Sequence, residues 1–152
     1  MWCSDLPLRL RTLTALLALA ALALCWAAPA LAEPLAVVTA RQGGVTALDR
    51  ETAEQLFLGR RTTLADGRAV TLVDLPAGAE RDRFYLQLTG KNPSQIRAYW
   101  SRLVFTGRSQ PPREAASTDD ALRLVLATPG AIAYLPLTAA QTPELLILLT
   151  LD

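Results

Sequence analysis

The sequence predicts an α/β domain in which helices pack on a small sheet. Short apolar runs with strand character alternate with segments whose apolar residues repeat at helical spacing. Turn and capping residues separate these segments, and neither an internal repeat nor a low-complexity stretch interrupts them. This alternation is typical of an α/β fold with helices flanking a sheet.

The N-terminal residues predict export through a cleaved signal peptide. Arg9 and Arg11 form a basic region, the run from residue 13 to 26 is almost entirely Leu and Ala, and an A-x-A pattern ends at Ala32. We therefore expect a signal at 1–32, a domain at 33–152 and a periplasmic location. The alternative is an uncleaved anchor, for which the apolar run is short, since a span needs about 20 residues. Lipidation at Cys25 is not expected, because the preceding Leu24 is large.

The first half of the domain contains two predicted strands and two predicted helices. The strands are Leu35–Val38 and Ala69–Leu75, the second preceded by the turn Asp66–Gly67. One helix is capped by Asp49 and stops at Gly59, with Ala53, Leu56 and Phe57 on one face. The other follows the loop Pro76–Gly78 and ends at Gly90, with Phe84, Tyr85 and Leu88 on one face.

The next helix carries the strongest start signal in the chain. Asn92 is its N-cap, Pro93 takes the first helical position, and Gln95 completes a capping box. Its inward residues repeat at helical spacing, and it ends near Phe105–Gly107. The spacing of four aromatic residues predicts that they lie in the core: Phe84, Tyr99, Trp100 and Phe105.

The last third of the chain predicts a loop, a helix and two strands. Residues 108–116 are polar and contain two prolines, which indicates an irregular loop. Ser117 or Thr118 caps a helix with acidic residues in its first turn, and three of its residues are expected to face inward: Leu122, Val125 and Leu126. The turn Pro129–Gly130 precedes a strand at Ala131–Leu135, and the final strand is Leu145–Leu151.

The composition argues against several classes of function. The chain has no His, and both cysteines lie in the signal, so the usual general base, thiol nucleophile and transition-metal ligands are absent from the mature domain. We therefore expect no enzyme, no cofactor and no metal. Without Asp5, Arg9 and Arg11 of the signal, 15 basic and 14 acidic residues become 13 of each, so nucleic-acid binding is not expected either.

One segment fits the binding of a small anion. The strand Ala69–Leu75 leads through a loop into a helix, and a helix N-terminus offers unpaired backbone N–H groups and a positive dipole end. Arg81 and Arg83 are close by, and a guanidinium can grip an oxyanion with two hydrogen bonds. The candidate binding residues are Ala77, Gly78, Ala79, Arg81 and Arg83. The alternative is an ordinary loop before a helix.

An ordered series of short motifs resembles the phosphate-type ABC transporter substrate-binding proteins. Leu56–Arg60 is similar to the family's "IFxGK" segment, and Arg81–Phe84 has the form R-x-x-F. The turn Asp66–Gly67 lies between these two motifs, and three further elements follow them: Ala98–Trp100, Phe105–Gly107 and Pro111–Pro112. Pro129–Tyr134 then resembles the family's "PGAIGY", with Ala133 in place of its glycine.

The resemblance implies the fold of type II periplasmic binding proteins, and the chain has room for about one of their two lobes. In the family, the loop equivalent to Ala77–Arg81 carries a Ser-Gly-Thr sequence that holds phosphate. Here that loop reads Ala-Gly-Ala-Glu-Arg, without either hydroxyl and with Glu80 near the expected anion.

Two functions are therefore consistent with the sequence, and the breadth of the resemblance favours the first over the alternative. The first is a periplasmic module that binds a small anion such as phosphate for ABC transport, with a second wall supplied by a homodimer or a partner. The second is an interaction or sensory-accessory module that has lost its ligand and presents a surface to an inner-membrane permease or sensor protein.

Overall fold

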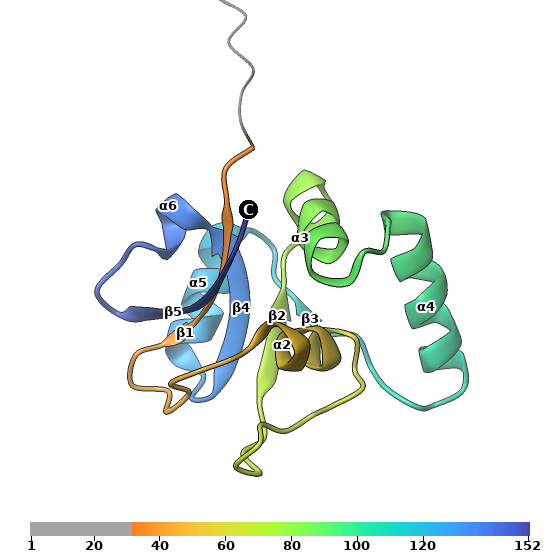
Figure 1. Cartoon of the computed structure of the whole chain (residues 1–152), viewed down its shortest axis with the longest axis horizontal. Helices are drawn as coiled ribbons and strands as arrows, with labels where there is room; N and C mark the ends of the chain where they lie inside the picture. The colour runs from red at the N-terminus through yellow and green to blue at the C-terminus, as the bar shows by residue number, and fades with distance from the viewer. Residues whose placement is uncertain (1–31) are drawn as a thin grey trace, which may run out of the picture. The chain divides into compact units, whose positions relative to one another are not determined.

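The computed structural model of the protein describes residues 32–152, which include one compact unit, Glu33–Asp152 (Figure 1). The predicted signal peptide lies outside the described residues except for Ala32. No helix within residues 32–152 combines the length and apolar character needed to cross a membrane.

A mixed sheet of five strands forms the centre of this unit, in the order β3-β2-β4-β1-β5. The strands are β1 (Leu35–Ala40), β2 (Thr71–Asp74), β3 (Arg113–Glu114), β4 (Ala131–Pro136) and β5 (Leu145–Leu151). β1 is antiparallel to β4 and β5, whereas β2 is parallel to β3 and β4. The α/β prediction is confirmed. The short β3 lies in the segment predicted as an irregular loop.

Five helices accompany the sheet: α2 (Arg50–Phe57), α3 (Ala79–Thr89), α4 (Pro93–Phe105), α5 (Thr118–Ala127) and α6 (Leu137–Ala140). The sequence predicts the first four and misses the single turn of α6. The predicted caps are present, because Asp49 accepts a hydrogen bond from the Thr52 N–H at 2.8 Å and Asn92 forms a capping box with Gln95. Of the two residues predicted as the N-cap of α5, Ser117 is the one that caps it.

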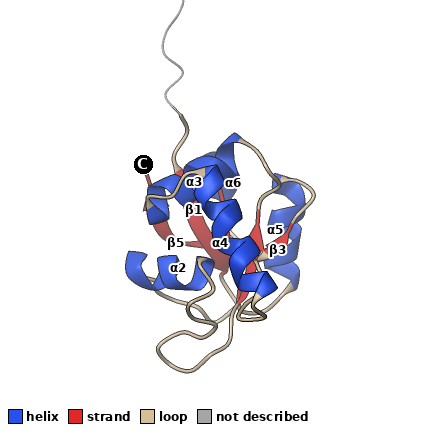
Figure 2. Ribbon diagram, turned by 90° about the vertical axis from the view of Figure 1, so that its right-hand side faces the viewer, coloured by secondary structure: helices blue, strands red, loops and turns tan. Residues whose placement is uncertain are grey.

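The core lies on both faces of the sheet, with α5 on the side opposite α2 (Figure 2). On the α2 side, Phe57, Phe84 and Tyr134 form an aromatic cluster in which the rings of Phe84 and Tyr134 stack at 3.5 Å. On the other side, Ala121 and Val125 are the buried residues of α5. Residues 35–39 are all buried, which explains why β1 is continuously apolar from Leu35 to Val38.

The end of α2 is fixed by Gly59, which stops the helix as predicted. Gly59 adopts a φ of 63°, which favours glycine. A side chain there would place its Cβ 2.8 Å from the Trp100 ring, so α4 packs directly over this turn.

Two of the predicted core residues are exposed. Phe105 is 93% exposed, because it lies nine residues after Ile96 and therefore half a turn away from the buried face of α4. Leu126 is also exposed, since one residue after the buried Val125 the helix has already turned about 100°. Phe84 and Trp100 are buried as predicted, whereas Tyr99 is half-buried and donates its hydroxyl hydrogen to the Leu58 carbonyl at 2.7 Å.

Candidate functional site

The predicted anion loop joins the end of β2 to the start of α3. Ala77, Gly78 and Ala79 are exposed, and Gly78 is the N-cap residue of α3. Gly78 has no side chain to occupy the first N–H groups of the helix, so these groups face the surface. The local geometry is therefore the strand–loop–helix arrangement that the sequence predicts.

Arg81 is enclosed by two carboxylates of its own chain. One guanidinium nitrogen lies 3.0 Å from an Asp74 oxygen at the end of β2, and another lies 2.7 Å from a Glu114 oxygen in β3. The Arg81 side chain is only 21% exposed. The guanidinium thus ties α3 to the two strands at this end of the sheet, and both of these nitrogens already have anionic partners.

Asp74 is the buried centre of this cluster, with a relative exposure of 1%. Its carboxylate accepts hydrogen bonds from the hydroxyls of Tyr85, at 3.0 Å, and Tyr134, and it pairs with Arg81. Burial raises the pKa of Asp74, while Tyr134 and Arg81 oppose that shift. Burial and the neighbouring Asp74 also raise the pKa of both tyrosines, which therefore stay protonated as hydrogen-bond donors.

Arg83 lies on a different side of α3 from Arg81. Two residues correspond to about 200° of helical rotation, so the two side chains cannot converge on one anion. Arg83 is half-buried and lies close enough to Glu33 to lower the pKa of that carboxyl, which hydrogen bonds with Thr138 lower more strongly. The structure therefore does not bring Arg83 together with the other candidate residues.

A small pocket of about 130 Å³ lies beside Arg81, between α3 and the start of α4. Its lining contains two of the five candidate residues and adds an arginine of α4: Ala77, Arg81, Asp82, Tyr85, Pro93, Ile96 and Arg97. Sequence analysis misses Arg97, because nothing in the spacing shows that the first turn of α4 lies against α3. The pocket could admit a small anion between Arg81 and Arg97, although Asp82 also lines it.

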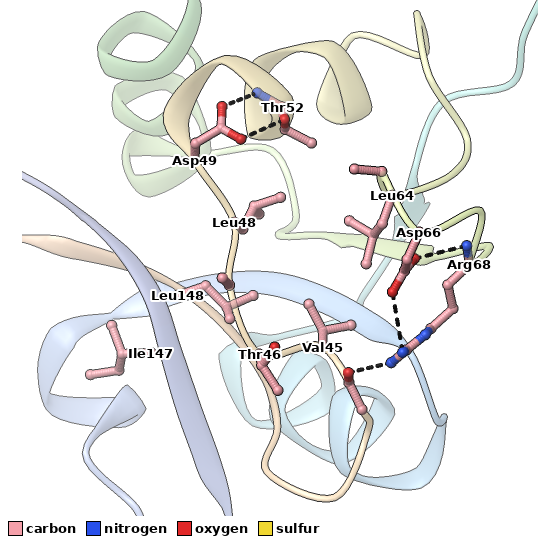
Figure 3. Close-up of a pocket in the computed structure, with 13 residues that line it drawn as sticks. Val45, Thr46, Leu48, Asp49, Thr52, Leu64, Asp66, Arg68, Ile147 and Leu148 are labelled. Carbon is pink, nitrogen blue, oxygen red and sulfur yellow. Dashed lines mark hydrogen bonds and ion pairs between the residues drawn. The ribbon is translucent and has the colours of Figure 1, made fainter.

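A larger pocket, with a volume of about 600 Å³, lies elsewhere, next to β5 (Figure 3). Val45, Leu48, Leu64 and Leu148 contribute apolar surface. Its charged residues are already engaged, because Asp49 caps α2 and Arg68 pairs with Asp66 at 3.2 Å. This pocket therefore presents no free charge for an anion.

The described residues contain no group of three or more acidic side chains, histidines or cysteines that could hold a metal ion. The polar side chains of the described residues are most concentrated in the cluster around Asp74, where every charged group has a partner. Such a cluster can hold elements of the fold together, and its small neighbouring pocket is the site with which an anion could interact.

Solved structures show the same fold as this chain. An ABC-type phosphate transport receptor from Vibrio cholerae matches with a TM-score of 0.58 and 16% sequence identity over 76% of this chain. A protein assigned as a phosphate ABC transporter substrate-binding protein, from Clostridium perfringens and with bound phosphate, matches with a TM-score of 0.57 and the same identity and coverage. This chain covers 45% and 44% of those two chains.

The fold implied by the motif series is thereby confirmed, as a partial match of the size of one lobe. The chain spans less than half the length of either protein. No protein-family model matches the chain, and no curated protein is similar to it in sequence.

Proposed function

We propose that this domain is an exported interaction module, built on the fold of phosphate-binding transport proteins, whose anion loop has been closed by its own carboxylates. The observation that carries the proposal is the double pairing of Arg81 with Asp74 and Glu114. An arginine that already satisfies two carboxylates has little free charge to offer a phosphate.

The surroundings of the loop support the same conclusion. Glu80 and Asp82 lie in the first turn of α3, and Glu114 is exposed beside Arg81. These carboxylates would repel an incoming phosphate at a distance where charge interactions are strong. The loop from 77 to 81 also has no hydroxyl group with which to replace the water around the anion.

The proposed location is the periplasm, and the proposed partners are an inner-membrane permease or a sensor protein. The described domain has the fold of transport-related binding proteins, and no metal cluster or histidine in it suggests chemistry of its own. A homodimer is a further proposed assembly, because the chain covers less than half of the proteins that share its fold.

A second candidate function is the binding of a small anion for ABC transport. It is favoured by the pocket that Arg81 and Arg97 line together, and by the likeness in fold to a protein solved with bound phosphate. In this case Arg97 would supply the free charge, since Arg97 forms no ion pair within the described residues.

Titration calorimetry of the purified protein with inorganic phosphate at low salt separates the two functions. The interaction module predicts no heat of binding and no thermal shift at millimolar phosphate. Saturable micromolar binding would instead support the transport function. Loss of that binding in Arg97→Ala, but not in the exposed control Arg123→Ala, would locate it in the pocket between α3 and α4.

A further inference from the structure

The segment that contains α4 is strongly cationic within a domain of balanced charge. From residue 83 to residue 113 the sequence has no Asp or Glu, and it carries six basic residues: Arg83, Lys91, Arg97, Arg102, Arg108 and Arg113. The remaining domain therefore holds all of the acidic residues of 33–152. A segment with this excess of positive charge attracts a negatively charged partner.

Five of these six cations, all except Arg83, have no anionic partner among the described residues. Arg97, Arg102, Arg108 and Arg113 are exposed, and Lys91 is half-buried. None of the five forms an ion pair within the described part of the chain, and Arg97 is bonded only to the Ser94 hydroxyl, at 3.1 Å. The acidic side chains on neighbouring elements include Asp82, which shares a pocket with Arg97, and Glu114, which pairs with Arg81.

The outward face of α4 combines these charges with exposed apolar side chains. Ile96 and Trp100 bury the inner face, while Ala98, Arg102 and Phe105 follow one another along the outside at i, i+4 and i+7. Phe105, on this outward face, is 93% exposed, so its ring is available to an apolar partner surface. α4 lies at the edge of the domain beyond α3, where a broad partner can reach it (Figure 1 and Figure 2).

A shallow groove along the same face is suited to a phosphate group. It has a volume of about 460 Å³ and is lined by Lys91, Gln95, Ala98, Tyr99 and Arg102, with two cations and no carboxylate. Phe105 lies one turn beyond Arg102 on the same stripe. We call the stripe formed by Lys91, Gln95, Ala98, Arg102 and Phe105 the α4 surface.

We propose that the α4 surface docks the domain on an anionic lipid bilayer, with Lys91 and Arg102 bound to headgroup phosphates and Phe105 inserted at the interface. The inference rests on the proposed role as an interaction module and names its partner surface. Cations spread along a helix beside one exposed aromatic side chain match a plane of many identical phosphate groups. An acidic protein is instead expected to bind a pocket whose shape complements its own more closely.

Flotation of the purified protein with lipid vesicles tests this assignment. We expect the protein to bind vesicles of equal parts phosphatidylglycerol and phosphatidylcholine, and not vesicles of phosphatidylcholine alone. Lys91→Gln with Arg102→Gln should weaken binding about tenfold or more, because each basic residue contributes strongly to attraction by an anionic surface. The matched control, Arg50→Gln with Arg123→Gln, removes two exposed arginines outside the α4 surface and should leave binding unchanged.

Phe105→Ser provides a second variant that is expected to fold normally, since the ring is exposed. It should still bind at low salt and should detach at a salt concentration that the wild-type protein withstands, because screening removes the electrostatic part of the interaction. Equal salt resistance of the two proteins would overturn the insertion of Phe105.

Three results would overturn the lipid assignment. The first is no binding to anionic vesicles, and the second is full displacement from them by inorganic phosphate, which would indicate a site for the free ion. The third is equally tight binding to poly-glutamate that is lost in the same double variant, which would assign the surface to an acidic protein. None of these depends on the phosphate titration of the α3 pocket, which tests the proposed function through Arg97.

Discussion

Arginines of α3 and α4 occupy opposite environments although the two helices are consecutive in the chain. Arg81 of α3 is mostly enclosed and joins Asp74 to Glu114, whereas Arg97 and Arg102 of α4 are exposed and form no ion pair among the described residues. The first arrangement stabilises the fold, and the second leaves charge available to a partner. An arginine near a predicted binding loop can thus serve the fold, while the available charge lies one helix later.

Substitutions on the two faces of α4 are expected to differ most in their effect on the free energy of unfolding. Trp100 is 7% exposed and packs against the turn at Gly59, so Trp100→Ala should leave a cavity. We expect it to lower the free energy of unfolding by about 3–5 kcal/mol, measured by urea denaturation. Phe105→Ala should change that free energy by less than about 0.5 kcal/mol.

A loss in Phe105→Ala as large as in Trp100→Ala would contradict this contrast. It would mean that the Phe105 ring contributes to the core and is not available on the α4 surface. The comparison between the two variants is sound because both side chains are aromatic and belong to the same helix.

The contrast between the two arginines predicts a smaller but distinct difference. Arg81→Ala leaves Asp74 buried with only its two tyrosine partners, and removal of one member of a buried ion pair is costly. We expect a loss of about 3 kcal/mol in the free energy of unfolding, at the lower end for such pairs because Arg81 is partly exposed. Arg97→Ala, measured in the same way, should change that free energy by less than about 0.5 kcal/mol.

If Arg81→Ala proves as stable as Arg97→Ala, the pairing with Asp74 contributes little to the fold. Arg81 would then be free to act as the anion ligand that the sequence predicts, and the closed loop of the proposed function would have to be abandoned.

Much of the fold follows from local signals, and for that reason it could be predicted. The capping box at Asn92, the stop at Gly59 and the caps at Asp49 and Ser117 each depend on residues a few positions apart. Helical periodicity alone places Phe105 in the core, because it does not follow the rotation of α4 to its last residue. The turn of α6 and the two residues of β3 are too short to leave a periodic pattern.

The candidate site was harder to predict, because its decisive contacts join residues distant in sequence. Glu114 lies 33 residues after Arg81, and Tyr134 lies 60 residues after Asp74. A single sequence does not show such pairs. One signal in the sequence does point to this cluster. Asp74 interrupts the apolar run around Val73 and Leu75, and a charge at a buried strand position requires a partner.

The raised pKa of Asp74 predicts a dependence of stability on pH. Because the folded-state pKa of Asp74 lies above its ordinary value of 3.8, the folded protein binds this proton more tightly than the unfolded chain does. The stabilisation that the protonated Asp74 side chain contributes is therefore complete below pH 3.8, and it is lost as the pH rises through the folded-state pKa.

Asp74→Asn removes this titration while keeping the size of the side chain. Urea denaturation of both proteins from about pH 4 upward should show the wild-type protein losing stability relative to the variant, with a slope of at most about 1.4 kcal/mol per pH unit. A difference that stays constant with pH would mean that Arg81 and the two tyrosines fully offset the burial of Asp74. A difference of opposite slope would mean that Arg81 and the two tyrosines outweigh the burial of Asp74. Arg81 would then be held by a carboxylate that stays ionised.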